Sequence, residues 1–182
     1  MVVQLTRNDP RRLSRGGGFS LIELIAVMVI VVILAATVAP VLSATTGARA
    51  AMAAKQLVRD LTFARQRAVA TGTRSWVVFD TGADTWSVLA EDPSSPGRIN
   101  AAVLTDPATS GPFVQSLGVN QFVGVQLVTA SFDAGPEIGF DWLGRPLNET
   151  EAALAAQGSV TLSGSHVITV EVGSGFVAYT PP

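Results

Sequence analysis

Residues 19–42 constrain the fold of this chain more than any other segment. They form a run of 24 residues in which Glu23 is the only charged one. As a helix this run would span about 36 Å, enough to cross a bilayer core of about 30 Å. Four arginines precede it, and basic residues in that position predict a cytoplasmic N-terminus. The pattern predicts a single-pass membrane helix with the rest of the chain exported.

A cleaved secretory signal peptide is the alternative reading of the same run. Its uninterrupted apolar part, residues 24–38, is at or beyond the long end of such a core, which is typically about 7–15 residues. The best small-residue cleavage site is Thr37-Val38-Ala39, and Pro40 follows it directly. Because proline is a poor residue after a cut, the permanent anchor is the favoured interpretation.

Glu23 is the unusual residue in this run. A carboxylate at the centre of a bilayer costs about 2.5–3.5 kcal/mol on insertion scales, and near one end the cost is smaller but still suggests a use. If the chain were cut after Gly18, the new amine of Phe19 would lie about one helical turn from Glu23. We expect that amine to neutralise the carboxylate, either within one subunit or from a neighbour when helices pack side by side.

The stretch RGGGFSLIELI resembles the class III signal of type IV pilins and pseudopilins. In that family a prepilin peptidase cuts after the glycine and N-methylates the new terminal phenylalanine. The resemblance therefore implies processing between Gly18 and Phe19 and an assembly role for Glu23. Pro40 matches a proline that is common in these helices.

Helical periodicity continues beyond the apolar run. Six positions fall at i, i+4, i+7 spacing and form one stripe: Ala50, Ala54, Leu57, Leu61, Ala64 and Ala68. The alanines predict close packing of this stripe on a sheet, and Thr71-Gly72 is a plausible end of the helix. Pro40 lies inside the helix and should kink or loosen it.

After Gly72 the apolar pattern changes to a period of two, which is typical of strands. The ranges with this pattern are 74–80, 85–91, 122–130, 138–142, 159–162, 167–172 and 176–179. Residues 98–118 are ambiguous, and residues 148–157 are consistent with a short helical insertion. Trp76, Trp86 and Trp142 alternate with apolar residues and are expected in the core.

The organisation predicted from these patterns is α+β, a long N-terminal transmembrane helix packed on a small antiparallel β head. Together with the resemblance to the class III signal, these patterns imply that residues 1–18 are a cleaved leader, 19–42 the transmembrane and assembly helix, 43–72 its periplasmic continuation and 73–182 the head. The stretches AAKQLVRDLTFARQRAVATGTRSWVVFD and IGFDWLGRPLN resemble the H-type minor pseudopilins of type II secretion and the related FimT minor pilins. This resemblance implies a subunit of a secretion pseudopilus or, alternatively, a type IV pilus minor pilin in pilus assembly or DNA uptake.

Charge is segregated along the chain. Residues 75–182 carry eleven carboxylates and two arginines, a formal charge of −9, whereas residues 49–74 carry +5. The acidic head disfavours nucleic-acid binding. Some FimT-type pilins contact DNA through a Gly-Arg-x-Arg turn, but here Gly144-Arg145 is followed by Pro146 and Leu147, so a plain connecting turn is the favoured reading.

The basic side of the helix carries Lys55, Arg59, Arg67 and Arg74. These residues can be simply solvated, can lie near anionic lipid headgroups, or can meet the acidic head of a neighbouring subunit. The charge segregation favours the last of these three readings.

Catalytic and metal-binding patterns are missing from the sequence. The chain has no cysteine and one histidine, His166, so neither a disulfide nor a His-rich metal site is expected. Asp80 and Asp84 are too sparse for a calcium loop and fit a hairpin turn. We therefore expect no cofactor and no enzymatic activity. The resemblance implies other partners: the prepilin peptidase, other pseudopilins and the inner-membrane assembly platform of a Gram-negative-type envelope.

Overall fold

The computed structural model describes residues 20–133 and 135–182, without the side chains of residues 36–44. The chain divides into two compact units between Val41 and Leu42. One helix, α1 (Leu21–Thr71), has residues in both units. It ends where the sequence predicts, because Gly72 adopts a φ of 70° and donates its N–H to the carbonyl of Ala68 at 3.0 Å.

The predicted membrane helix is only partly covered by this description. Among the side chains that the structure describes, no helical stretch is both long enough and apolar enough to span a membrane. The predicted range, residues 19–42, includes Phe19 and the side chains of residues 36–42, which lie outside the described part. The leader, Gly18 and the cleavage position also lie outside it.

The second unit contains two antiparallel sheets. The strands of the described chain are β1 (Ser75–Asp80), β2 (Thr85–Ala90), β3 (Ala102–Val103), β4 (Val114–Ser116), β5 (Leu127–Ser131), β6 (Glu137–Phe140), β7 (Pro146–Leu147), β8 (Gly158–Leu162), β9 (His166–Val170) and β10 (Val177–Thr180). The first sheet has the order β3-β2-β1-β6-β7 with β4 also paired to β2, and the second has the order β10-β9-β8-β5. Two single 3₁₀ turns, η1 (Arg98–Asn100) and η2 (Asn120–Phe122), lie in the connections.

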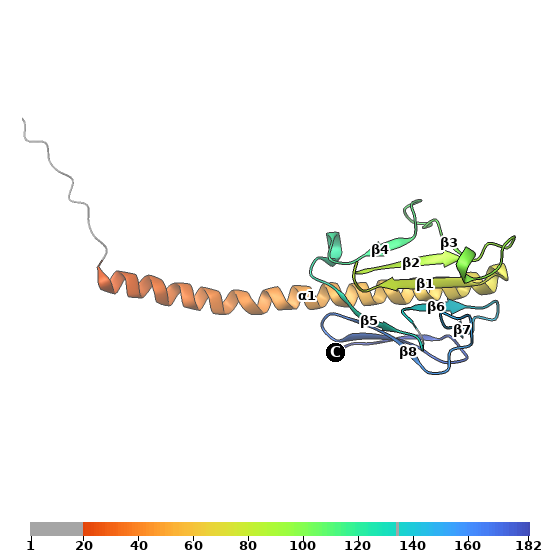
Figure 1. Ribbon diagram of the computed structural model, residues 1–182. Coiled ribbons are helices and arrows are strands. Elements are labelled where there is room, and N and C mark those ends of the chain that lie inside the picture. Colours follow the sequence, from red (N-terminus) through yellow and green to blue (C-terminus); the bar gives the residue numbers. More distant parts are fainter. Residues whose placement is uncertain (1–19, 134) are drawn as a thin grey trace, which may run out of the picture. The chain divides into compact units, whose positions relative to one another are not determined.

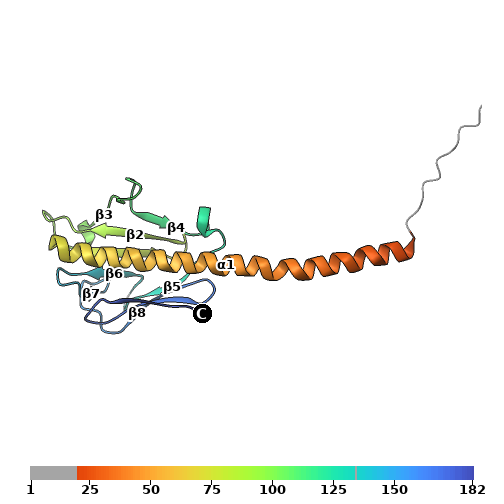
Figure 2. The same cartoon turned by 180° about the vertical axis from the view of Figure 1, so that it is seen from behind.

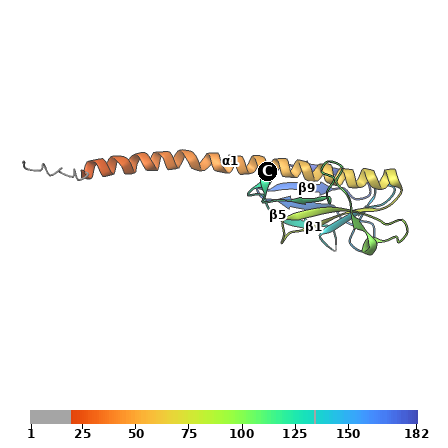
Figure 3. The same cartoon turned by 90° about the horizontal axis from the view of Figure 1, so that it is seen from above.

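Both sheets pack against the part of α1 that belongs to the second unit (Figure 1). Seen from behind, the helix passes in front of the two sheets, and seen from above both sheets lie on one side of it (Figures 2 and 3). All six residues of the predicted stripe are at most 1% exposed. They form a single core with the inward side chains of both sheets, including Val77, Trp86, Ile138, Val160 and Ile168. The predicted packing of the alanine stripe on sheet structure is confirmed.

Two local predictions were wrong. Residues 148–157 form turns instead of a helix, because the Asn148 side chain accepts the N–H groups of Thr150 and Ala152 at 3.0 and 3.1 Å and so closes a turn. Trp142 is 49% exposed because β6 ends at Phe140 and Trp142 sits in the following turn.

The predicted strand over residues 122–130 is also shorter than expected. Residues 120–122 form η2, and β5 begins only at Leu127. Gly124 has a φ of 83°, a conformation that strands do not use. The alternating apolar pattern of the sequence therefore includes residues before Leu127 whose backbone does not form part of a strand.

Candidate assembly site

Glu23 lies in the first turn of α1. The N–H groups of Glu23 and Leu24 both donate to the carbonyl of Ser20, at 3.0 and 3.1 Å, so the helix begins directly at this point. A carboxylate in the first turn is favoured by the partial positive charge of the helix N-terminus. Gly18 and Phe19, the predicted processing residues, lie outside the described part of the chain, so the pairing of Glu23 with a terminal amine stays a prediction.

Pro40 lies in the interior of α1, which continues through it from Leu21 to Thr71. The boundary between the two compact units, at Val41 and Leu42, falls next to this residue. Its side chain lies outside the described part of the chain, so the predicted kink and assembly role of Pro40 stay predictions.

The large apolar side chains of the first helical turns are exposed on every side of the helix. Twelve of them, from Leu21 to Leu34, are between 52% and 78% exposed. A helix that is apolar all round is normally buried against lipid or protein. This surface therefore needs an apolar environment that a single chain in water does not provide.

Fewer basic side chains of α1 are available for a partner than the sequence suggests. Lys55 and Arg59 are exposed, but Arg67 is half-buried, donates to the Ser75 hydroxyl at 3.3 Å, and has its pKa lowered by burial. Arg74 forms ion pairs with Glu91 and Glu151 of the same chain. Only Lys55 and Arg59 of the four predicted residues remain available to a neighbouring subunit or to lipid.

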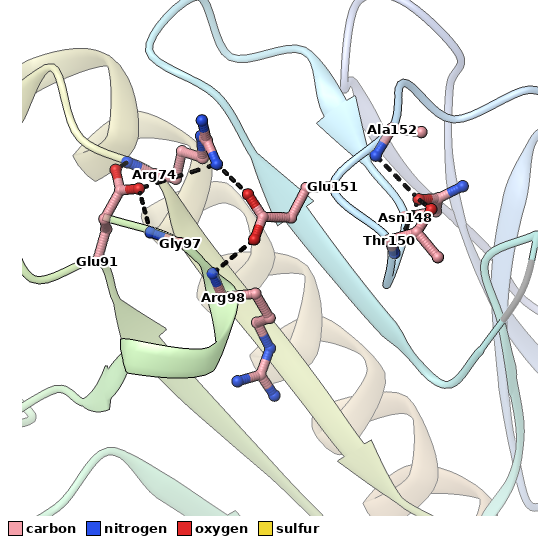
Figure 4. A network of polar contacts seen from close by, with 8 residues as sticks. All are labelled: Arg74, Glu91, Gly97, Arg98, Asn148, Thr150, Glu151 and Ala152. Atoms are coloured by element: carbon pink, nitrogen blue, oxygen red, sulfur yellow. Dashed lines mark hydrogen bonds and ion pairs between the residues drawn. The ribbon is translucent and has the colours of Figure 1, made fainter. Parts of the chain in front are cut away.

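Arg74 belongs to a polar network at the end of the head (Figure 4). Its backbone N–H donates to Glu91 at 2.9 Å, and the other oxygen of Glu91 accepts the N–H of Gly97 at 2.9 Å. Glu151 joins the guanidinium of Arg74 to the backbone N–H of Arg98, the second contact being 2.7 Å. These contacts connect β1, β2 and η1 to the turn after β7.

The guanidinium of Arg98 extends this network to a fifth element. It donates to both oxygens of Glu137 on β6, at 2.8 and 2.7 Å, in the two-point geometry that suits arginine and carboxylate. Two arginines therefore pair with three glutamates within the head, which leaves an excess of one negative charge. This network anchors loops and leaves little free charge for a partner.

The Gly144-Arg145 turn is organised by Asp141. One oxygen of Asp141 accepts the N–H groups of Leu143 and Arg145, at 2.9 and 2.8 Å, and the other accepts the Arg145 Nε at 2.7 Å. Burial raises the pKa of Asp141, but the hydrogen bonds from Arg145 and Leu143 outweigh burial and leave the pKa lowered. The arginine that could contact a phosphate is thus held by its own turn.

Asp60 is a buried polar residue that the sequence reasoning missed. It is 3% exposed and accepts hydrogen bonds from Gln56 Nε2 and from Trp86 Nε1, both at 2.8 Å. Burial raises its pKa to about 6, against the lowering effects of those two hydrogen bonds and of the Arg59 charge. A sequence signal existed: Asp60 is three residues after Leu57 and four before Ala64, within the buried stripe.

His166 and the described carboxylates do not form a metal centre. His166 is 5% exposed and its Nδ1 lies 2.6 Å from the Tyr179 hydroxyl. Across the residues that the structure describes, no group of three or more histidines or carboxylates is arranged to hold a metal ion.

Comparison with known proteins identifies the fold. No protein-family model matches the sequence, and no curated protein matches it. Two solved structures of the minor pseudopilin EpsH from the type 2 secretion system of Vibrio cholerae are similar, with TM-scores of 0.54 and 0.52 at 10% and 11% identity. Each alignment covers 74% of this chain, and they cover 96% and 94% of the EpsH chains. The chain has a pseudopilin-like fold.

Proposed function

We propose that this chain is a minor pseudopilin, a structural subunit that enters the periplasmic pseudopilus of a type II secretion system. The observation that carries the proposal is a combination of two features in one chain. The first turns of α1 expose apolar side chains on every side, and the chain has a pseudopilin-like fold over 74% of its length. A helix of this kind serves successively in lipid and in a bundle of helices, since both environments are apolar.

The proposed sequence of events begins with a precursor in the inner membrane. Residues 19–42 cross the bilayer once, with the N-terminus cytoplasmic and the head periplasmic. A prepilin peptidase removes residues 1–18 and methylates the amine of Phe19. The helix then leaves the membrane by packing against other pseudopilins at the assembly platform, where Glu23 sets the axial register through its ion pair with a Phe19 amine.

Processing is tested by the intact mass of the protein isolated from membranes. We expect a mass that lacks residues 1–18 and carries one additional methyl group on Phe19. A Gly18→Val variant serves as the control, because a branched side chain at the cut should block cleavage while leaving the apolar helix unchanged. Full-length mass for the native sequence in cells that contain the peptidase would contradict the proposal.

Register setting is tested by replacing Glu23 with Val or with Gln. Both variants should be inserted and cleaved normally, because the apolar run and the cut are unchanged, and both should enter filaments at least about tenfold less, a loss of about 1.4 kcal/mol. Site-specific cross-linking of subunits measures filament entry, and Ile22→Val is the matched control in the same turn. Normal entry of the Gln variant would show that the charge of Glu23 does not set the register.

A further inference from the structure

The head contains a cavity whose chemistry the assembly proposal does not use. It has a volume of about 520 Å³ and lies between α1, the connection from β3 to β4, and η2. The side chains of α1 that line it are Gln56, Arg59, Asp60 and Phe63. All of these elements belong to the second compact unit.

The cavity continues along β4. A second cavity of about 430 Å³ is lined by all three residues of β4 and shares Asp106, Thr109, Gln115 and Gln121 with the first. Within the described sheets β4 pairs only with β2, so its other edge has no strand beside it. The two cavities form one groove, which we call the β4 groove, and it is longer than a single side chain.

The floor of this groove is a carboxylate that forms no direct ion pair within the described part of the chain. Asp60 lines the groove, and each of its oxygens accepts one N–H donor at 2.8 Å, which leaves each oxygen able to accept another. None of the ion pairs found in the described part of the chain includes Asp60 or Asp106. Arg59, the one cation in the lining, donates its guanidinium to Gln56.

The walls of the groove fit the remainder of a cationic side chain. Phe63 and Phe113 both line it, with ring centroids 5.4 Å apart at 41°, and such faces suit aliphatic stems and guanidinium planes. Gln115 is the register partner of Trp86, so its amide lies on the same face of the sheet as the Asp60 contact. The carbonyls of Gln115 and Gln121 can accept further N–H donors.

We propose that the β4 groove binds an extended segment of a partner protein and takes one arginine side chain of that segment against Asp60. The guanidinium donates to the free acceptor positions of the carboxylate, with Asp106 adding negative charge and the two phenyl rings, which contact each other, lying together on one side of the stem. A bound cation further offsets the burial of the Asp60 charge, which the two hydrogen bonds and the Arg59 charge of the head offset only in part. The segment lies along the unpaired edge of β4, the arrangement by which peptides extend a sheet.

The test uses the full chain in detergent micelles with ¹⁵N-labelled tryptophan and two synthetic peptides. One is acetyl-Ala-Val-Arg-Val-Ala-amide, and the other has citrulline, a neutral isostere, in place of arginine. The Trp86 indole N–H reports on the site because it donates to Asp60. The other two tryptophans serve as internal references. Trp142 is half-exposed in the turn after β6, and Trp76 has Leu89 as its register partner.

We expect the arginine peptide to shift the Trp86 indole resonance saturably and the references not at all, with the citrulline peptide binding at least about tenfold more weakly. Asp60→Asn, which retains an acceptor for Trp86, should weaken arginine-peptide binding by about the same factor, and Asp92→Asn, an exposed carboxylate outside the groove, should not change it. Gln121→Arg, at an exposed position on the rim, should also weaken it without altering the core. Equal affinities for the two peptides, unchanged affinity of the Asp60 and Gln121 variants, or no saturable shift would each overturn the proposal.

Discussion

At the scale of single residues, the most informative position is Asp60, which has no unusual feature in the sequence. Asp60 lies on a helix among basic residues, where a carboxylate is expected to be solvated. The fold buries it at 3% exposure because it occupies a position of the alanine and leucine stripe. Trp86, from a strand 26 residues further along the chain, supplies one of its two hydrogen bonds. The raised pKa of about 6 is the consequence of that burial.

The pH dependence of stability should reveal this residue. Since the folded-state pKa of Asp60 is raised to about 6 from 3.8, the folded chain binds this proton more tightly than the unfolded chain. The free energy of unfolding should therefore rise as pH falls from about 6 to about 4, by on the order of 2 kcal/mol relative to the Asp60→Asn variant. Urea unfolding of both proteins at pH 7 and pH 4 measures the difference.

Asp92→Asn is the control for that experiment, because the pKa of Asp92 is shifted in the opposite direction from the pKa of Asp60. Hydrogen bonds from Ser94 lower the pKa of Asp92, so its contribution to stability is lost as the pH falls through that lowered pKa. An Asp60→Asn variant with the same pH dependence as the native chain would contradict the burial of an ionisable carboxylate.

At the scale of the elements, periodicity explains what was predicted and turn chemistry explains what was missed. β8 and β9 alternate strictly between buried and half-buried residues, as the period of two predicts. Two of the three errors lie where side chains bond to nearby backbone, at Asn148 and at Asp141. Such local bonds compete with helix and strand and leave no periodic trace in the sequence.

Two glycines offer a matched test of how tightly the elements pack. A Cβ on Gly158, the first residue of β8, would lie 2.2 Å from Cδ1 of the buried Phe132 ring. Gly158→Ala should therefore lower the free energy of unfolding by about 1–3 kcal/mol. Gly47, inside α1, has nothing within 4 Å of the added atom, so Gly47→Ala should raise it by up to about 1 kcal/mol.

Thermal unfolding followed by circular dichroism measures both glycine variants against the native chain. Opposite signs for the two changes are the expected result. A Gly158→Ala variant as stable as the native protein would show that the Phe132 ring moves aside without cost.

At the scale of the whole molecule, the division into two compact units separates the packed core from the exposed apolar turns of α1. The main core cluster and the partly buried residues packed on it lie between Ala50 and Tyr179, inside the unit Leu42–Pro182. The exposed apolar turns of α1 belong to the other unit. The second unit therefore contains the contacts that a stable core requires.

Removing residues 1–41 should leave a head that folds by itself and stays in solution without detergent. We expect its free energy of unfolding to differ from that of the full chain in detergent by less than about 1 kcal/mol, since no core residue is removed. Chemical denaturation followed by tryptophan fluorescence measures both. A non-cooperative transition of the truncated chain would show that the N-terminal turns of α1 contribute to the fold.

Features that depend on neighbouring residues could be predicted from the sequence. The helix is predicted by its periodicity and its stop at Thr71-Gly72, and several strands by their alternation, because local backbone preference and one buried face are enough to specify them. The tertiary structure alone decided that the strands form two sheets, that Trp142 faces outward and that Asp60 meets Trp86. These features depend on which distant segments pair, and pairing is selected by the packing of the whole core.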